Sequence, residues 1–367
     1  MYLVKNNEDF VNYYINKKID WSLFTFNRLY LGGDAIDYAI SHESESVRFK
    51  LLGYVRKMFD GDKSVIQTIE SLAQYGMEFA YLFIADLYDR DTPEWTDYLN
   101  KAAKAGVLSA IVENALAKLE KGDESQIKVL DECGRKGESK AYYILSKYYY
   151  ESEDYENAGK YLILAADGYY LDAISTAAQF YSYDNEIFDA DHQKSLSYAK
   201  LAYELNDDES GILYARLLYS SDDIETDFEK AERVLLDLSD AGNAEAKFWL
   251  LDLWANAGVD EEESGDAYFK TAKEAVEGGF ANANIFLGIC YSNGIGCEMD
   301  EEKAIEVFNN GIEYLESLED DVEDRVNAYK TQIAIIYKRH NLCQHCGGEF
   351  GGIVSKTCKS CGRKKDY

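Results

Sequence analysis

The sequence predicts an all-α protein, a solenoid of stacked helix pairs that ends in a small cysteine-rich hairpin module. A short phrase ending in alanine recurs along most of the chain, at intervals of 30 to 38 residues. Such a period is typical of repeats that each form one helix pair. Pro93 is the single proline, as expected of helices joined by short turns. Four of the seven cysteines form two C-x-x-C pairs near the C-terminus.

Composition and charge limit the classes of partner. The 367 residues are 47% hydrophobic, too apolar for a disordered chain, and carry 68 acidic against 38 basic side chains. The net charge of −30 repels phosphate backbones and anionic membranes over about 8 Å at physiological salt. Neither a secretory signal nor an apolar run of about 20 residues is present, so we expect a cytoplasmic protein that binds proteins.

The repeat is defined by its small and aromatic positions. In each clear copy a glycine is followed four residues later by an anchor alanine: Ala80, Ala110, Ala141, Ala246 and Ala283. A longer copy ends at Ala173, and a degenerate one lies near Gly211. Eight residues after most anchors comes an aromatic residue: Tyr88, Tyr149, Tyr181, Tyr219, Trp254 and Tyr291. Small residues also recur five positions after the anchor. These offsets place the set on one helical face, where small residues permit close helix contact.

A second helix is predicted after each first one. The stretches YENAGKYLILAADG, FEKAERVLLDLSDAG and EEKAIEVFNNG place apolar residues three and four apart and end in glycine, which suits a left-handed C-cap. Thr92 before Pro93 predicts an N-cap, and the spacing of Thr226 and Glu229 is that of a capping box.

One unit carries a recognisable pattern. Residues 287–311 contain a Leu-Gly pair, an aromatic, a Gly-x-Gly turn, an acidic residue and Lys-Ala: Leu287, Gly288, Tyr291, Gly294, Gly296, Asp300, Lys303 and Ala304. This unit resembles a Sel1-like repeat, a relative of the tetratricopeptide repeat. The resemblance covers residues 46–312, about seven to eight repeats, and fades toward the N-terminus. It implies a right-handed superhelix of antiparallel helix pairs that acts as a protein-binding scaffold.

Both ends of such an array need caps. Residues 1–45, which are rich in aromatics, are predicted to form the N-terminal helical cap. Residues 313–339 are predicted to form a C-terminal capping helix, because they carry one apolar stripe: Val322, Val326, Tyr329, Ile333 and Ile336. Residues 340–367 then form a separate module.

The paired cysteines predict a metal site. Cys343 and Cys346 form the first pair, Cys358 and Cys361 the second, and eleven residues separate the pairs. Four thiolates on two tight turns suit one tetrahedral ion, and the spacing resembles a zinc ribbon. We expect a single structural Zn²⁺, since four thiolates leave no open position for water. Iron, as in rubredoxin, is the less favoured ion, and His345 is a less favoured ligand.

The terminal module is basic on an otherwise acidic chain. Residues 338–367 carry a net charge of +5 and residues 1–337 carry −35. The basic surface predicted for the ribbon comprises Lys356, Lys359, Arg363, Lys364 and Lys365. It could contact nucleic acid, dock on acidic protein, including the solenoid of this chain, or simply be solvated.

Exposed aromatics are the candidate partner contacts of the solenoid. A tyrosine-rich stretch at residues 141–162 has more rings than one helical face can bury. The candidates are Tyr142, Tyr148, Tyr150, Tyr214 and Trp249. No nucleophile elbow, Walker loop or zincin pattern is present, so we predict no enzyme activity. The favoured function is a protein-binding scaffold that uses the concave face of the solenoid, with a structural zinc ribbon as a cap or accessory contact. The alternative is a polyanion-binding adaptor that acts through that ribbon.

Overall fold

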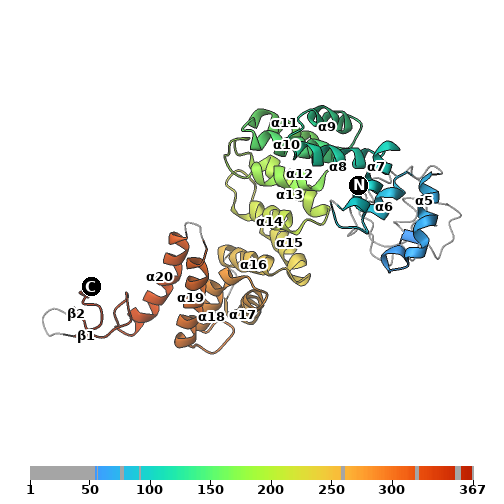
Figure 1. Ribbon diagram of the computed structural model, residues 1–367. Helices are drawn as coiled ribbons and strands as arrows, with labels where there is room; N and C mark the ends of the chain where they lie inside the picture. Colours follow the sequence, from blue (N-terminus) through green and yellow to red (C-terminus); the bar gives the residue numbers. More distant parts are fainter. Residues whose placement is uncertain are drawn as a thin grey trace. The chain divides into compact units, whose positions relative to one another are not determined.

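Two compact units make up the chain, one ending at Asp207 and the other beginning at Asp208. The computed structural model describes residues 54–55, 57–74, 78–90, 92–257, 261–318, 322–351 and 357–365. The predicted N-terminal cap, residues 1–45, lies outside the described residues. Each unit is described by itself (Figure 1).

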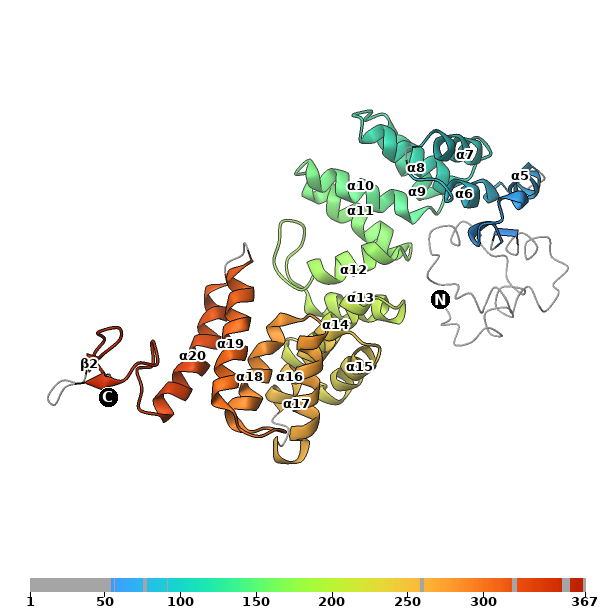
Figure 2. The ribbon, with the colours of Figure 1, turned by 60° about the horizontal axis from the view of Figure 1, so that its bottom comes forward.

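The first unit is a row of helices in which each packs mainly against its neighbours in sequence (Figures 1 and 2). Its described elements are η1 (Lys63–Val65), α5 (Ile66–Gln74), α6 (Ala80–Ala85), α7 (Pro93–Lys104), α8 (Leu108–Leu119), α9 (Gln126–Arg135), α10 (Ser139–Glu151), α11 (Tyr155–Asp167), α12 (Leu171–Phe180) and α13 (His192–Glu204). Short turns join most of them, as expected of helical hairpins.

The second unit continues the same plan and adds a hairpin. Its helices are α14 (Asp208–Ser220), α15 (Phe228–Asp240), α16 (Ala244–Ala257), α17 (Glu261–Glu277), η2 (Ala281–Ala283), α18 (Asn284–Asn293), α19 (Glu301–Glu316) and α20 (Glu323–Arg339). Two short antiparallel strands follow, β1 (Phe350–Gly351) and β2 (Thr357–Cys358). The predicted all-α class, with successive helices packed together and a small terminal hairpin, is confirmed.

The repeat positions lie where the helices touch. All six anchor alanines are fully buried: Ala80, Ala110, Ala141, Ala173, Ala246 and Ala283. Five residues beyond Ala283, Gly288 lies beneath the ring of Phe308, and a Cβ there would come 2.3 Å from the ring. Only a residue without a side chain permits this approach of α18 to α19. Phe308 is itself fully buried, which contributes about 1.5–3 kcal/mol to stability.

Aspartate caps mark the starts of the second helices. Asp154, Asp191, Asp227 and Asp300 each accept a hydrogen bond from the backbone N–H three residues later. The predicted capping box at Thr226 is therefore wrong by one residue, because the neighbouring Asp227 carboxylate occupies the N-cap position of α15. The prediction for Thr92 is confirmed, since its hydroxyl accepts from the Trp95 N–H at 3.3 Å.

The predicted glycine C-caps have mixed outcomes. Gly242 adopts the left-handed conformation with φ of +95° and is confirmed. Gly168 does not, because Tyr169 takes the left-handed position, with φ of +61°. Gly311 does not end its helix, because α19 continues to Glu316 and the ring of Tyr329 packs onto the bare glycine backbone.

Helix α20 packs against α19. Its buried residues are Val326, Tyr329, Ile333 and Ile336, which pack on α19 in the cluster that contains Phe308. The Tyr329 hydroxyl donates to the Asn282 carbonyl at 2.8 Å and so ties α20 to the preceding repeat. In the described part of the chain, no helix combines the length and the hydropathy needed to cross a bilayer.

Candidate functional site

Two tight turns present the four terminal cysteines. In the first, the N–H groups of Cys346 and Gly347 both donate to the Cys343 carbonyl, at 3.2 and 2.7 Å. In the second, the Gly362 N–H donates to the Cys358 carbonyl at 3.0 Å. The glycine after each pair is left-handed, which is the conformation that turns the chain back beside the sulfurs. The sequence thus builds two equivalent knuckles.

The hairpin brings the two knuckles together. Phe350 pairs with Cys358 and Gly351 with Thr357 between β1 and β2. All four sulfur atoms then lie within 4.8 Å of one another. The Sγ atoms of Cys343 and Cys361 are 3.7 Å apart, and those of Cys346 and Cys358 are 3.5 Å apart. These distances are far longer than a disulfide bond of about 2.0 Å.

The sulfur spacing fits a tetrahedral ion. Zinc–sulfur bonds of about 2.3 Å place the sulfurs of a tetrahedron about 3.8 Å apart, close to the separations observed. The four predicted ligands are therefore brought together in a group that could hold a metal ion. His345 lies exposed inside the first turn and is not part of this group.

The electrostatics of the sulfurs also suit a cation. The backbone N–H of Cys361, assisted by that of Ser360, lowers the pKa of the Cys358 thiol to about 6 and so favours the thiolate. The Gly348 N–H lowers the pKa of Cys346, but hydrogen bonding with the neighbouring cysteines, Cys361 first, and burial together outweigh it and raise the pKa to about 12. Thiolates this close repel one another, and a divalent ion would relieve that repulsion.

The module contacts the end of α20 through apolar and backbone groups. The Leu342 N–H donates to the Tyr337 carbonyl at 2.9 Å. Gly347 lies against the ring of Tyr337, so closely that a Cβ there would be 2.8 Å from it. The first knuckle therefore rests on the last turn of the solenoid.

Two of the basic residues of the module contact other side chains of the module. Lys359 forms an ion pair with Glu349 at 2.8 Å. Lys365 contacts the Asn341 side chain and lies 5.5 Å from the centre of the Phe350 ring. Arg363 and Lys364 are exposed, and neither has a side-chain partner among the described residues. Lys356 lies outside the described residues.

Two of the five aromatic candidates are part of the core packing. Tyr142 covers Gly134, and its ring centre is 5.8 Å from that of Tyr161. Tyr214 is only 3% exposed, with the Lys230 ammonium 5.5 Å from its ring centre. Tyr214 is therefore buried, whereas Tyr142 is half-buried.

The other three aromatics reach the surface. Tyr150, on α10, is 43% exposed. Tyr148, on the same helix, is half-buried and packs edge-on against Tyr149. In the second unit, half-buried Trp249 has the guanidinium of Arg216 3.9 Å from its ring centre. These rings offer apolar area beside polar groups, which is typical of partner contacts.

Comparisons with solved structures identify the fold. The Sel1 repeat protein from Oxalobacter formigenes superposes with a TM-score of 0.52 and 18% identity, over 66% of this chain and 69% of that one. The protein c5321, described as a protective antigen of uropathogenic Escherichia coli with an SLR fold, gives a TM-score of 0.61 and 17% identity, over 83% of this chain and 67% of that one. No established family profile and no curated protein matches the sequence. The chain thus has the Sel1-like repeat fold that residues 287–311 predict.

The structure contains a second candidate region that the sequence did not predict. A cleft in the second unit is lined by residues near Met299 and by the end of α20. Residues 298–302 read as Glu-Met-Asp-Glu-Glu, an exposed methionine within an acidic run, and this was the only local signal for it.

Proposed function

We propose that the protein is a non-catalytic scaffold that binds other proteins along its helical repeats and folds its C-terminal ribbon around one structural Zn²⁺. The observation that carries the metal part is the group of four sulfurs at tetrahedral spacing. The Sel1-like repeat fold supports the scaffold part, since stacked helix pairs create extended surfaces for protein partners. Cytoplasmic localisation is part of the proposal, because free thiols persist in a reducing compartment.

In this proposal the ion organises the ribbon. The strands β1 and β2 are each two residues long, too short for a hairpin that is stable alone. Zinc bound to four thiolates contributes on the order of 10 kcal/mol, enough to fold such a module. Metal analysis of purified protein should find one zinc per chain. A coloured aerobic preparation with one iron would instead identify a rubredoxin-like centre.

The partner surface of the first unit is proposed to include Tyr148 and Tyr150 on α10, and that of the second to include Trp249. Proteins captured from the native cell should be retested in purified form against a variant with both tyrosines replaced by alanine. The matched control is Tyr183→Ala, since Tyr183 is 53% exposed and lies between α12 and α13. Loss of binding in the double variant alone supports the surface, and equal binding by all three proteins contradicts it.

The alternative function is polyanion binding through the ribbon. It is favoured by Arg363 and Lys364, which are exposed and have no side-chain partner among the described residues. If it is correct, the protein should retard RNA or DNA in a salt-dependent manner, because counterion release drives such binding. The shift should vanish when both residues are replaced by alanine.

A further inference from the structure

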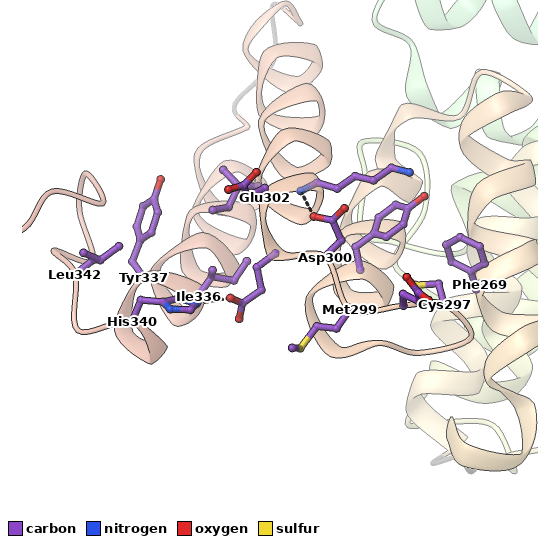
Figure 3. Close-up of a pocket in the computed structure, with 14 residues that line it drawn as sticks. Phe269, Cys297, Met299, Asp300, Glu302, Ile336, Tyr337, His340 and Leu342 are labelled. Carbon is purple, nitrogen blue, oxygen red and sulfur yellow. Dashed lines mark hydrogen bonds and ion pairs between the residues drawn. The ribbon is translucent and has the colours of Figure 1, made fainter.

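A cleft of about 850 Å³ lies where the last repeat meets the lead-in to the ribbon. Figure 3 shows Tyr337, His340 and Leu342 along one side of it and Met299 and Cys297 toward the other. Helices α17, α18, α19 and α20 all contribute to the lining, together with the turn before α19 and with His340 and Leu342 between α20 and Cys343. The cleft lies entirely within the second unit.

Apolar groups form much of its wall. Ile336, which is 2% exposed, lines the cleft together with the half-buried side chains of Tyr337 and Leu342. Met299 is 64% exposed at the rim. A flexible thioether in that position can repack around different apolar side chains. The cleft can accommodate an apolar group from a partner.

The rim is acidic, and not all of its charge is used internally. Asp300 caps α19 by accepting from the Lys303 N–H at 2.9 Å, and Glu301 pairs with Arg339 and His340. Glu298 and Glu302, by contrast, are exposed and have no side-chain partner among the described residues. Two carboxylates are thus free to meet a cation beside the apolar wall.

Lys303, which lines the cleft, does not neutralise Glu298 and Glu302. The Lys303 ammonium lies 4.3 Å from the ring centre of Tyr291, so the aromatic face already contacts it. A phosphate backbone would be repelled by the surrounding carboxylates. Charge complementarity therefore selects a positively charged protein segment.

We propose that this cleft binds an extended protein segment in which an apolar side chain is flanked by lysine or arginine. The apolar side chain enters against Tyr337, Leu342 and Met299, and the cationic side chains pair with Glu298 and Glu302. This site differs from the tyrosine surface of α10 and deepens the proposed scaffold function by naming a class of partner.

The cleft is also coupled to the metal ribbon, a step that rests on the proposed zinc site. Leu342 directly precedes the ligand Cys343, and Gly347, in the first knuckle, rests on the ring of Tyr337. Folding of the ribbon around its ion fixes both side chains of the wall. Zinc should then raise the affinity for the segment, and the segment should raise the affinity for zinc by the same factor.

The test uses full-length, zinc-loaded protein and a pool of short peptides whose central positions are drawn from Lys, Arg, Leu, Phe and Met. A pool with Asp and Glu in place of Lys and Arg is the control. Retained peptides are labelled and their affinities measured by fluorescence anisotropy. Replacing Glu298 and Glu302 together by glutamine should weaken binding about three- to tenfold at low salt. The matched variant E306Q/E313Q removes the same charge from exposed positions of α19 outside the cleft and should bind as wild type.

Each outcome decides a part of the proposal. Retention of neither pool, or equal weakening by both double variants, overturns the cleft as the binding site. For the coupling, the variant C346S/C361S should bind the peptides less tightly than wild type, and equal affinity overturns it. If metal analysis finds no zinc while peptide binding still depends on Glu298 and Glu302, the metal part of the proposed function fails and the cleft stands.

Discussion

Alanine substitution at the two glycines that follow the cysteine pairs should separate backbone strain from a side-chain collision. Gly347 has φ of +66° and Gly362 has φ of +74°, so each alanine would be forced into the left-handed region. A Cβ at Gly362 would meet nothing within 4 Å, whereas one at Gly347 would come 2.8 Å from the ring of Tyr337. Only the first knuckle should suffer both penalties.

The magnitudes follow from these two terms. The left-handed conformation costs a non-glycine residue about 1–2 kcal/mol. In the proposed zinc ribbon, metal binding and ribbon folding would be one equilibrium, so Gly362→Ala should weaken zinc binding by about 5- to 30-fold. Overpacking adds about 1–3 kcal/mol, so Gly347→Ala should weaken it by at least about 30-fold. Competition against a chromogenic chelator measures both affinities, and a thermal melt of the helical signal verifies that the solenoid is intact.

A third variant tests the cause of the difference. Tyr337→Ala removes the ring, so Gly347→Ala made in that background should cost no more than Gly362→Ala does in the wild type. If the two single alanine variants bind zinc equally, the collision with Tyr337 is not the explanation. If both bind zinc as tightly as wild type, the left-handed turns do not hold the ligands and the reasoning fails.

Three further predictions concern the solenoid. Ser146→Ala removes the buried hydrogen bond from the Ser146 hydroxyl to the Ala158 carbonyl (2.8 Å) and should lower the free energy of unfolding, measured in urea, by about 1 kcal/mol. An unchanged urea midpoint would contradict this prediction. Phe308→Ala empties the space above Gly288 and should cost about 3–5 kcal/mol by the same measurement. The contact with His340 lowers the pKa of Glu301 in the folded protein. The ionised Glu301 carboxylate should therefore stabilise the fold fully above about pH 4.3, and this stabilisation should be lost as the pH falls through the lowered pKa of the folded state. E301Q should flatten that part of the acid-unfolding curve.

The repeat positions could be predicted because each is set by contacts that recur locally. An anchor such as Ala246 must be small wherever two helices approach closely, so one constraint repeats with every helix pair. The cysteine module is predictable for a similar reason, since ligand chemistry dictates residue type and spacing within one short segment. Both signals depend on near neighbours in sequence.

Contacts between residues of different helices were not predicted. Gly311 has the sequence character of a helix end, but the ring of Tyr329, on another helix, explains why glycine is required there. Tyr142 belongs to a tyrosine-rich stretch, and the sequence does not show that its half-buried ring fills the space above Gly134 on the preceding helix. The cleft went unseen because Met299 and Leu342 come from separate elements that only the fold brings together.

The charge contrast between ribbon and solenoid has to be revised once the thiolates are counted. The net charge of +5 for residues 338–367 treats every cysteine as neutral. Four thiolates with one Zn²⁺ would contribute −2, leaving the module at about +3. Lys359 is already paired with Glu349. Polyanion binding would therefore depend mainly on Arg363 and Lys364, the residues whose replacement tests it.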